Sequence, residues 1–222
     1  SATSSIALMI SAAVPGTPAA VAPSAPATED PPADRTRPVL RPQWAVTTFG
    51  GWLTDDNIAP ALQFRATLFD NKIFGVAVSR RQARLWKDSE WGIEGQVVKH
   101  FGGVGELAQD HWEFNGLSTG SWNRFPWDGT IDTSFALGAG LSYATDVPNF
   151  ELYWKGASRQ LLFYLLVEAV GTLPNHPQWG FVWRIHHRSA AYGLLKDDLK
   201  GASNAFTFGL KYMFGSQVPR PR

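Results

Sequence analysis

The sequence contains no cysteine, which excludes disulfides, thiolate metal ligands and cysteine nucleophiles. Charged residues are also scarce, at 18% of the chain, against about 25% in a typical soluble domain. The 20 basic and 19 acidic side chains nearly cancel, so the charge balance does not favour a nucleic-acid partner. The best apolar runs, 6–14 and 161–167, fall short of the roughly 18 residues that a transmembrane helix needs. If this chain crosses a membrane, it must do so with strands.

Aromatic residues and glycine are plentiful instead, with 10 Trp and 21 Gly among 222 residues. From residue 43 onward, clusters of turn-forming residues separate short apolar segments, which is typical of strands joined by turns. The pattern predicts strands at 43–53, 73–86, 90–101, 110–122, 131–145, 159–171, 178–189 and 204–214. The segment 62–69 is either a ninth strand or an arm of an extracellular hairpin.

Polar and apolar residues alternate along these strands. In 131–145 one row is Phe135, Leu137, Ala139, Leu141 and Tyr143, opposite Asp132, Ser134, Gly138, Gly140 and Ser142. In 204–214 one row is Phe206, Phe208, Leu210, Tyr212 and Phe214, opposite Thr207, Gly209 and Lys211. Alternation alone also fits a soluble barrel with an apolar interior.

Three further features favour a membrane barrel over a soluble one. Charged side chains occupy the polar rows, the strands are long, and tryptophan recurs at strand ends, as in an interfacial girdle. The girdle residues are Trp44, Trp52, Trp86, Trp91, Trp112, Trp122 and Trp179. We therefore predict an all-β fold over 43–214, an eight-stranded antiparallel transmembrane barrel of the bacterial outer membrane. Both termini of the chain should then be periplasmic. The apolar rows, including Phe135, Leu137, Leu141, Phe206, Phe208 and Leu210, should point outward.

The polar rows should then line the lumen. Its charged members are expected to pair with one another; they are Glu90, Glu94, His111, Glu113, Asp132, Arg184 and Arg188, with His186 beside them. His100, His111 and His186 lack the close spacing of metal ligands, so the sequence predicts no metal site and no cofactor.

The ends of the chain differ from this body. Residues 1–42 are rich in Ala, Pro, Ser and Thr, a composition that cannot bury enough apolar surface to fold alone. We expect an extended tail that is either a linker or a docking arm for a protein partner. Its first 22 residues are also similar to the apolar core and Ala-Val-Ala end of a secretion signal. Residues 215–222 form a C-terminal extension beyond the barrel.

A serine and a histidine stand together near the end of strand 178–189. His187 and Ser189 continue the apolar row of Trp179, Phe181 and Trp183, so they should face outward near the extracellular rim. Residues two apart on a strand are neighbours on one face, where an imidazole can activate a hydroxyl as a nucleophile. A pair that faces lipid suits a substrate that is itself a membrane lipid.

This segment, His187-Arg-Ser-Ala-Ala-Tyr-Gly193, resembles the His-x-Ser-Asn-x-Gly motif of the outer-membrane lipid A 3-O-deacylases. The segments Gln96–Phe101, Trp122–Trp127, Asp132–Phe135 and Gly140–Ala144 look like an acyloxyacyl-hydrolase-related branch of that superfamily. The resemblance implies an eight-stranded barrel whose Ser-His-Glu triad hydrolyses an acyl ester of lipid A. It assigns Ser189 as nucleophile and His187 as base, and it makes outer-membrane lipid, either lipid A or phospholipid, the expected partner.

The chain departs from the family motif at two positions. Ala190 replaces the asparagine after the serine, and counting along the chain places Gly201 where the triad glutamate belongs. Asp197 or Asp198 is then the acid expected to orient His187. A triad without its acid loses control of the histidine tautomer, which lowers the rate by orders of magnitude. Two functions therefore remain open: a lipid ester hydrolase, and a catalytically inactive barrel that serves as a membrane anchor and binds a partner through residues 1–42.

Overall fold

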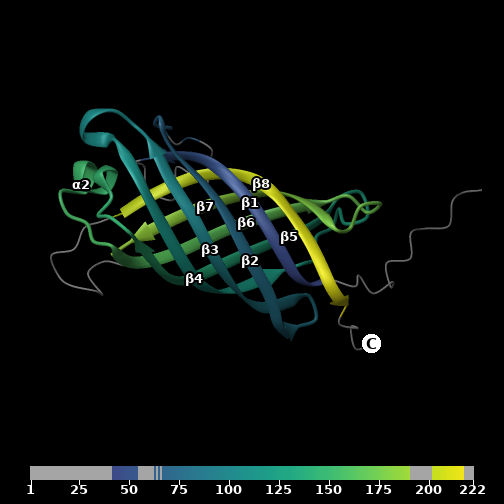
Figure 1. Ribbon diagram of the computed structural model, residues 1–222. Helices are drawn as coiled ribbons and strands as arrows, with labels where there is room; N and C mark the ends of the chain where they lie inside the picture. Colours follow the sequence, from purple (N-terminus) through teal and green to yellow (C-terminus); the bar gives the residue numbers. More distant parts are fainter. Residues whose placement is uncertain (1–41, 55–62, 64, 66, 191–201, 218–222) are drawn as a thin grey trace, which may run out of the picture. The chain divides into compact units, whose positions relative to one another are not determined.

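A computed structural model of the chain describes residues 42–54, 63, 65, 67–190 and 202–217. The expectations for the tail 1–42, apart from Pro42, and for 218–222 lie outside these residues, as do Asp197 and Asp198. The described residues contain eight strands in a closed antiparallel barrel, and each strand pairs with its neighbours in sequence (Figure 1). No helix among them is long and apolar enough to cross a membrane.

The strand bounds agree closely with the predicted ones. They are β1 (Pro42–Thr54), β2 (Asn71–Trp86), β3 (Ser89–Gly102), β4 (Gln109–Trp122), β5 (Asp132–Ala144), β6 (Leu161–Thr172), β7 (Trp179–Ser189) and β8 (Ala202–Gln217). Closure comes from β1 and β8, whose backbones pair from Pro42↔Gln217 to Thr54↔Asn204. The ninth strand considered for 62–69 is not present in the part of that segment that the structure describes.

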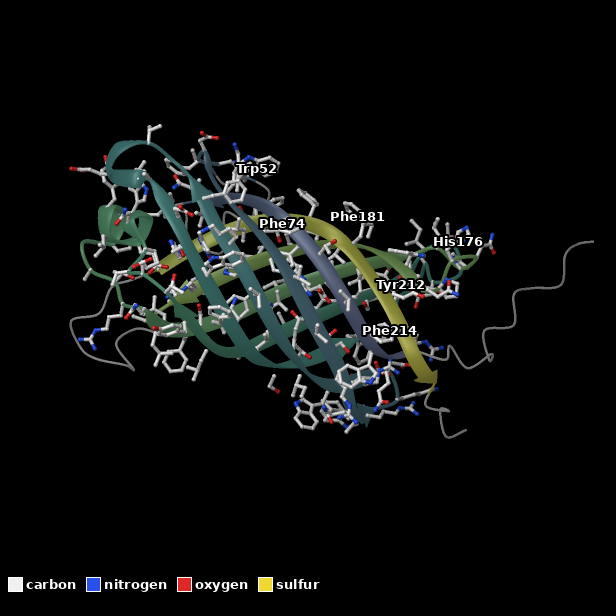
Figure 2. The ribbon with its side chains drawn as sticks, in the orientation of Figure 1. Trp52, Phe74, His176, Phe181, Tyr212 and Phe214 are labelled. Atoms are coloured by element: carbon white, nitrogen blue, oxygen red, sulfur yellow. The ribbon has the colours of Figure 1, made fainter. Side chains whose placement is uncertain are left out.

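The barrel has the inverted polarity of a membrane protein. Large apolar side chains lie exposed around the outside, as Trp52, Phe74, Phe181, Tyr212 and Phe214 do in Figure 2. Of the six residues expected to face outward, Leu137, Leu141, Phe208 and Leu210 are exposed and Phe135 is half-buried. Phe206 belongs to the same outward row but is only 8% exposed, and its ring packs against Trp183 and Phe208. All seven tryptophans of the predicted girdle are exposed near strand ends. The prediction of a lipid-facing apolar belt is confirmed.

A short helix that the strand pattern does not predict covers the extracellular end of the barrel. Helix α2 (Asn149–Lys155) lies between β5 and β6, at the end opposite the last residues of β8 (Figure 1). It follows Pro148 and stops at Gly156, whose φ of +73° is a conformation that glycine adopts without strain. A single 3-10 turn, η1 (Gly105–Leu107), packs beside it.

The lumen contains polar and charged side chains together with buried apolar ones such as Leu117 and Leu166, and it is most apolar at its extracellular end. There the ring of Phe150, from α2, is fully buried in an apolar cluster with inward-facing strand residues. The strand members of this cluster are Phe49, Leu53, Ile73, Ala77, Val98 and Ala205. The interior of an eight-stranded barrel is only wide enough for its own side chains. Helix α2 fills the extracellular end of that interior with the Phe150 ring. This arrangement is a closed barrel rather than a pore.

Candidate functional site

Polar and charged side chains form several groups inside the lumen and one group on the outer face of the barrel. Strand β7 contributes residues to both faces. Its even-numbered residues Arg184, His186 and Arg188 are buried in the lumen, whereas His187 and Ser189 lie on the lipid-facing side. The register predicted for this strand is therefore confirmed.

The first lumen group is a continuous ion-pair network across the barrel. The guanidinium of Arg184 donates to both carboxylate oxygens of Glu94, at 3.0 and 3.1 Å, and its Nε donates to Glu168 at 2.7 Å. Lys211 forms a further ion pair with Glu168. The Glu94 carboxylate also accepts from Gln96 at 2.8 Å. Buried charges persist when they are paired and hydrogen-bonded in this way.

A packed aromatic ring supports this network from the side. The Arg184 guanidinium carbon lies 4.9 Å from the centre of the Phe49 ring. That ring in turn lies over Gly75, where a Cβ would come within 2.5 Å of Phe49. Gly75 therefore makes room for the ring that supports the arginine. The network, together with its packing, joins β1, β3, β6, β7 and β8.

Two acidic residues that were expected among the paired lumen charges, Asp132 and Glu90, have partners outside this network. Asp132, expected to pair in the lumen, instead accepts a hydrogen bond at 3.1 Å from the backbone N–H of Gly129 in the periplasmic turn. The expectation for Asp132 was wrong because it sits at the first position of β5, where the turn's backbone donors are closer than the lumen charges. Glu90 pairs with Arg81 at 3.0 Å near the periplasmic mouth.

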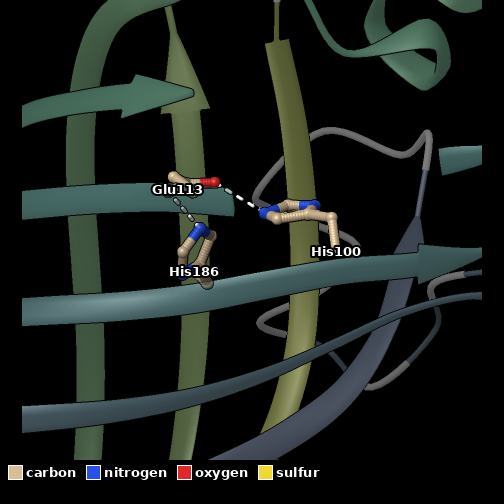
Figure 3. A group of neighbouring side chains, drawn as sticks. All are labelled: His100, Glu113 and His186. Carbon is tan, nitrogen blue, oxygen red and sulfur yellow. Dashed lines mark hydrogen bonds and ion pairs between the residues drawn. The ribbon is translucent and has the colours of Figure 1, made fainter. Parts of the chain in front are cut away.

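The second lumen group is a carboxylate held between two histidines. Glu113 is completely buried; its Oε2 lies 2.7 Å from His100 Nε2, and its Oε1 lies 2.9 Å from His186 Nε2 (Figure 3). Tyr164 completes the group, with its hydroxyl 3.1 Å from His186 Nδ1. The His111 ring stacks on His100, with ring centres 4.4 Å apart.

These residues come from β3, β4, β6 and β7 and are separated by up to 86 positions in sequence between His100 and His186. The spacing argument that predicted no metal site considered near neighbours along the chain, and a barrel brings together residues that are far apart in it. The alternation of polar and apolar residues could have indicated this group, because it places His100, Glu113 and His186 in the rows that face the same lumen.

Above this group, helix α2 contributes a buried acid. Glu151 is fully buried and its Oε1 lies 2.8 Å from Ser203 Oγ and 3.3 Å from an Arg188 nitrogen. Ser158 donates to its other oxygen. Arg188 also donates to the backbone carbonyl of Gln160 at 2.9 Å. Strand alternation could not identify Glu151, because it lies in a loop helix.

On the outer face, His187 has a partner that the sequence did not indicate. Its Nδ1 lies 2.6 Å from Oδ1 of Asn204, the residue directly opposite it on β8. Ser189 lies two residues further along the same face of β7. Outward neighbours from β6 are Leu165, opposite His187, and Phe163, opposite Ser189. Counting along the chain pointed to Gly201 or to a nearby Asp as the partner of His187; the residue that the strand register places opposite His187 is Asn204.

As placed, the Asn204 carbonyl oxygen accepts the proton of His187 Nδ1. This holds the ring in the tautomer whose Nε2 is free to act as a base, which is the orienting role of the third member of a triad. An asparagine fills that role in Cys-His-Asn proteases, although it brings no negative charge. The outer group is thus a serine, a histidine and an orienting amide on an apolar surface.

Comparisons with known proteins bear on the fold. No protein-family model matches the sequence, and a search of curated proteins finds no match. Among solved structures, the outer membrane enzyme PagL aligns with a TM-score of 0.54 at 12% identity, over 76% of this chain and 98% of PagL. Neisserial surface protein A aligns with a TM-score of 0.47 at 11% identity, over 77% of this chain and 97% of the Neisserial protein. Ail, the attachment invasion locus protein of Yersinia pestis, aligns with a TM-score of 0.39 at 14% identity, over 79% of this chain and 99% of Ail.

The PagL alignment agrees with the closed eight-stranded barrel, and the exposed apolar belt indicates where that barrel lies. This is an outer-membrane β-barrel. The exposed apolar belt, the aromatic strand ends and the charged, closed lumen agree with that location on independent physical grounds. At 12% identity the likeness concerns the fold alone, so any activity must be argued from the residues of this chain.

Proposed function

We propose that this barrel is an outer-leaflet lipid esterase, with Ser189 as nucleophile, His187 as general base and Asn204 as the residue that orients the base. The observation that carries the proposal is the 2.6 Å contact between His187 Nδ1 and Asn204 Oδ1 on the lipid-facing surface. Any imidazole N–H that faces lipid needs a hydrogen-bond partner, and Asn204 supplies it to His187 at Nδ1, which leaves Nε2 free as the base. A base that activates a nucleophile needs that one tautomer.

The surroundings suit an acyl ester. His187 and Ser189 lie near the ends of β6, β7 and β8 that we assign to the outer leaflet, and Leu165 on β6 is exposed beside His187. An acyl chain can lie against this apolar wall while its ester group, nearer the rim, reaches Ser189. The substrate class is therefore a lipid with ester-linked acyl chains, with lipid A and phospholipid as the two candidates.

The chemical steps follow those of serine hydrolases. Nε2 of His187 takes the proton of the Ser189 hydroxyl as the oxygen attacks the ester carbonyl, and the same proton passes to the leaving alcohol. Water then attacks the acyl-serine, with His187 again as base, and releases a fatty acid. Asn204 keeps Nδ1 protonated throughout, but as a neutral group it stabilises the imidazolium less than a carboxylate would.

The test is release of fatty acid by the purified full-length barrel in detergent micelles that contain lipid A or phospholipid, measured by mass spectrometry. The wild type should release fatty acid and Ser189→Ala should not. Ser118→Ala is the matched control, since Ser118 is also on the outer face and its Oγ accepts from Trp91 Nε1 at 2.6 Å. Equal release by wild type and Ser189→Ala would remove the esterase proposal. No release by any form would favour the inactive membrane anchor.

A further inference from the structure

Within the described part of the chain, the buried carboxylate of Glu113 has histidines as its ion-pair contacts and no arginine or lysine. Arg188 is paired with Glu151 instead, at 3.3 Å. Arg184, Lys211, Glu94 and Glu168 form their own balanced set of two positive and two negative charges. Glu113 therefore has two histidines as its contacts, and a buried carboxylate persists only where its charge and its hydrogen bonds are satisfied.

Hydrogen bonding does not fully satisfy this group either. Glu113 Oε1 and His186 Nε2 lie 2.9 Å apart, yet the ring N–H is not directed at the oxygen, so neither atom has a hydrogen-bond partner within the described part of the chain. His100 Nδ1 is likewise buried without a partner there. Buried polar atoms are rarely left in this state. A cation bound between these nitrogen and oxygen atoms would supply the partners that they lack.

We propose that His100, Glu113 and His186 bind one divalent transition-metal ion of the zinc type. One ligand atom from each residue lies within 4.8 Å of the others, and all three side chains are buried. Two imidazoles and one carboxylate form a donor set that zinc uses in proteins, with bonds of about 2.0–2.2 Å. Ligand atoms around a tetrahedral ion are about 3.3 Å apart. The 2.7 and 2.9 Å contacts, made by the two different oxygens of Glu113, are shorter than this, and the whole set lies within 4.8 Å, so side-chain shifts are needed to enclose an ion.

The neighbours supply what such a site requires beyond its ligands. When His186 Nε2 binds a metal, its Nδ1 carries the proton and donates to the Tyr164 hydroxyl, which already lies 3.1 Å away. This is the usual outer partner of a metal-bound histidine. His111 stacks on His100 and also lines a polar pocket near the extracellular loops, with Asp110 and Asp146 beside it. The pocket reaches His111, the residue stacked on His100, but its lining does not include the three ligands.

A bound ion would cross-link β3, β4 and β7 in the half of the barrel that carries His187 and Ser189. The ligands face inward and the serine faces outward, so the metal does not take part in the proposed ester chemistry. Its effect is on the rigidity of the barrel wall. This inference therefore stands whether or not the esterase proposal holds.

The test is zinc binding by the tag-free full-length barrel in detergent micelles, measured by isothermal titration calorimetry. The wild type should bind one Zn²⁺ per chain, and Zn²⁺ should raise its thermal unfolding midpoint. Glu113→Gln and His100→Gln should lose this binding, and Tyr164→Phe should weaken it about tenfold. His176→Ala is the matched control, because His176 is an exposed histidine in a periplasmic turn far from the group (Figure 2). A wild type that binds no zinc, or a loss that His176→Ala reproduces, would overturn the proposal.

The ligand variants must remain folded for this comparison, which heat-modifiable migration in gels reports. Should they fail to fold, X-ray absorption of the zinc-loaded wild type decides instead. Two imidazole nitrogens and a carboxylate oxygen at about 2.0–2.2 Å would support the site. A zinc shell without two imidazoles would contradict it.

Discussion

Arg184 on β7 donates hydrogen bonds to both carboxylate oxygens of Glu94 on β3, at 3.0 and 3.1 Å. The two residues are 90 positions apart in sequence and meet across the lumen. The pair is almost completely buried and is continued by Glu168 and Lys211. In a barrel whose strands pair only with their neighbours, this contact ties together opposite parts of the wall. It is thus the first place to test what stabilises the fold.

Glu94→Ala should lower the free energy of unfolding by about 3–5 kcal/mol, since it leaves part of a buried guanidinium charge without a partner. Urea unfolding in micelles, followed by tryptophan fluorescence, measures the change. The matched control is Asp110→Ala, which removes the exposed partner of Lys99 and should leave stability almost unchanged, because solvent screens an exposed ion pair. Equal losses in the two variants would show that the Glu94 pair is not a main stabilising contact.

The fold was largely predictable from the sequence because alternation with period two fixes which side chains face lipid. The rows containing Leu137 and Leu210 point outward as expected, and Arg184 and Glu113 point into the lumen. Alternation says nothing about which residues meet across a closed lumen or between paired strands. It therefore could not join His100 to His186 through Glu113, nor His187 to Asn204. Those contacts depend on register and closure, which follow from the whole barrel.

A charge on the apolar belt should be costly at mid-membrane. Leu210 is 53% exposed near the middle of β8, opposite Thr48 and Phe181. Leu210→Arg should reduce stability in lipid by about 2–4 kcal/mol. Leu173→Arg is the control, because Leu173 is similarly exposed, at 56%, but lies in the turn after β6. Refolding into vesicles at graded denaturant concentrations measures both, and a tolerated Leu210→Arg would contradict the assigned membrane depth.

Helix α2 should depend on its buried acid. Glu151→Ala leaves Arg188 without its carboxylate and removes the acceptor of Ser203. We expect residues 149–155 to exchange amide hydrogens at least about tenfold faster, since about 1.4 kcal/mol of lost local stability has that effect. Hydrogen exchange with mass spectrometry reads the segment directly. The exposed Glu106 in η1 offers the control, and unchanged protection in Glu151→Ala would show that Phe150 alone holds the helix.

The third member of the outer group provides the sharpest test of the proposed chemistry. Asn204 orients His187 but adds no charge, so Asn204→Asp should restore the carboxylate that stabilises the imidazolium in the transition state. Replacing the acid by an amide costs about 10⁴-fold in a serine protease, mostly through the wrong tautomer. Here the tautomer is already held, so we expect a smaller gain, about 10- to 100-fold in the rate of fatty-acid release. The double variant Ser189→Ala/Asn204→Asp is the control and should stay inactive. If Asn204→Asp leaves the rate unchanged while Ser189→Ala abolishes it, the base is not oriented through Asn204, and its partner must be sought elsewhere on the outer face.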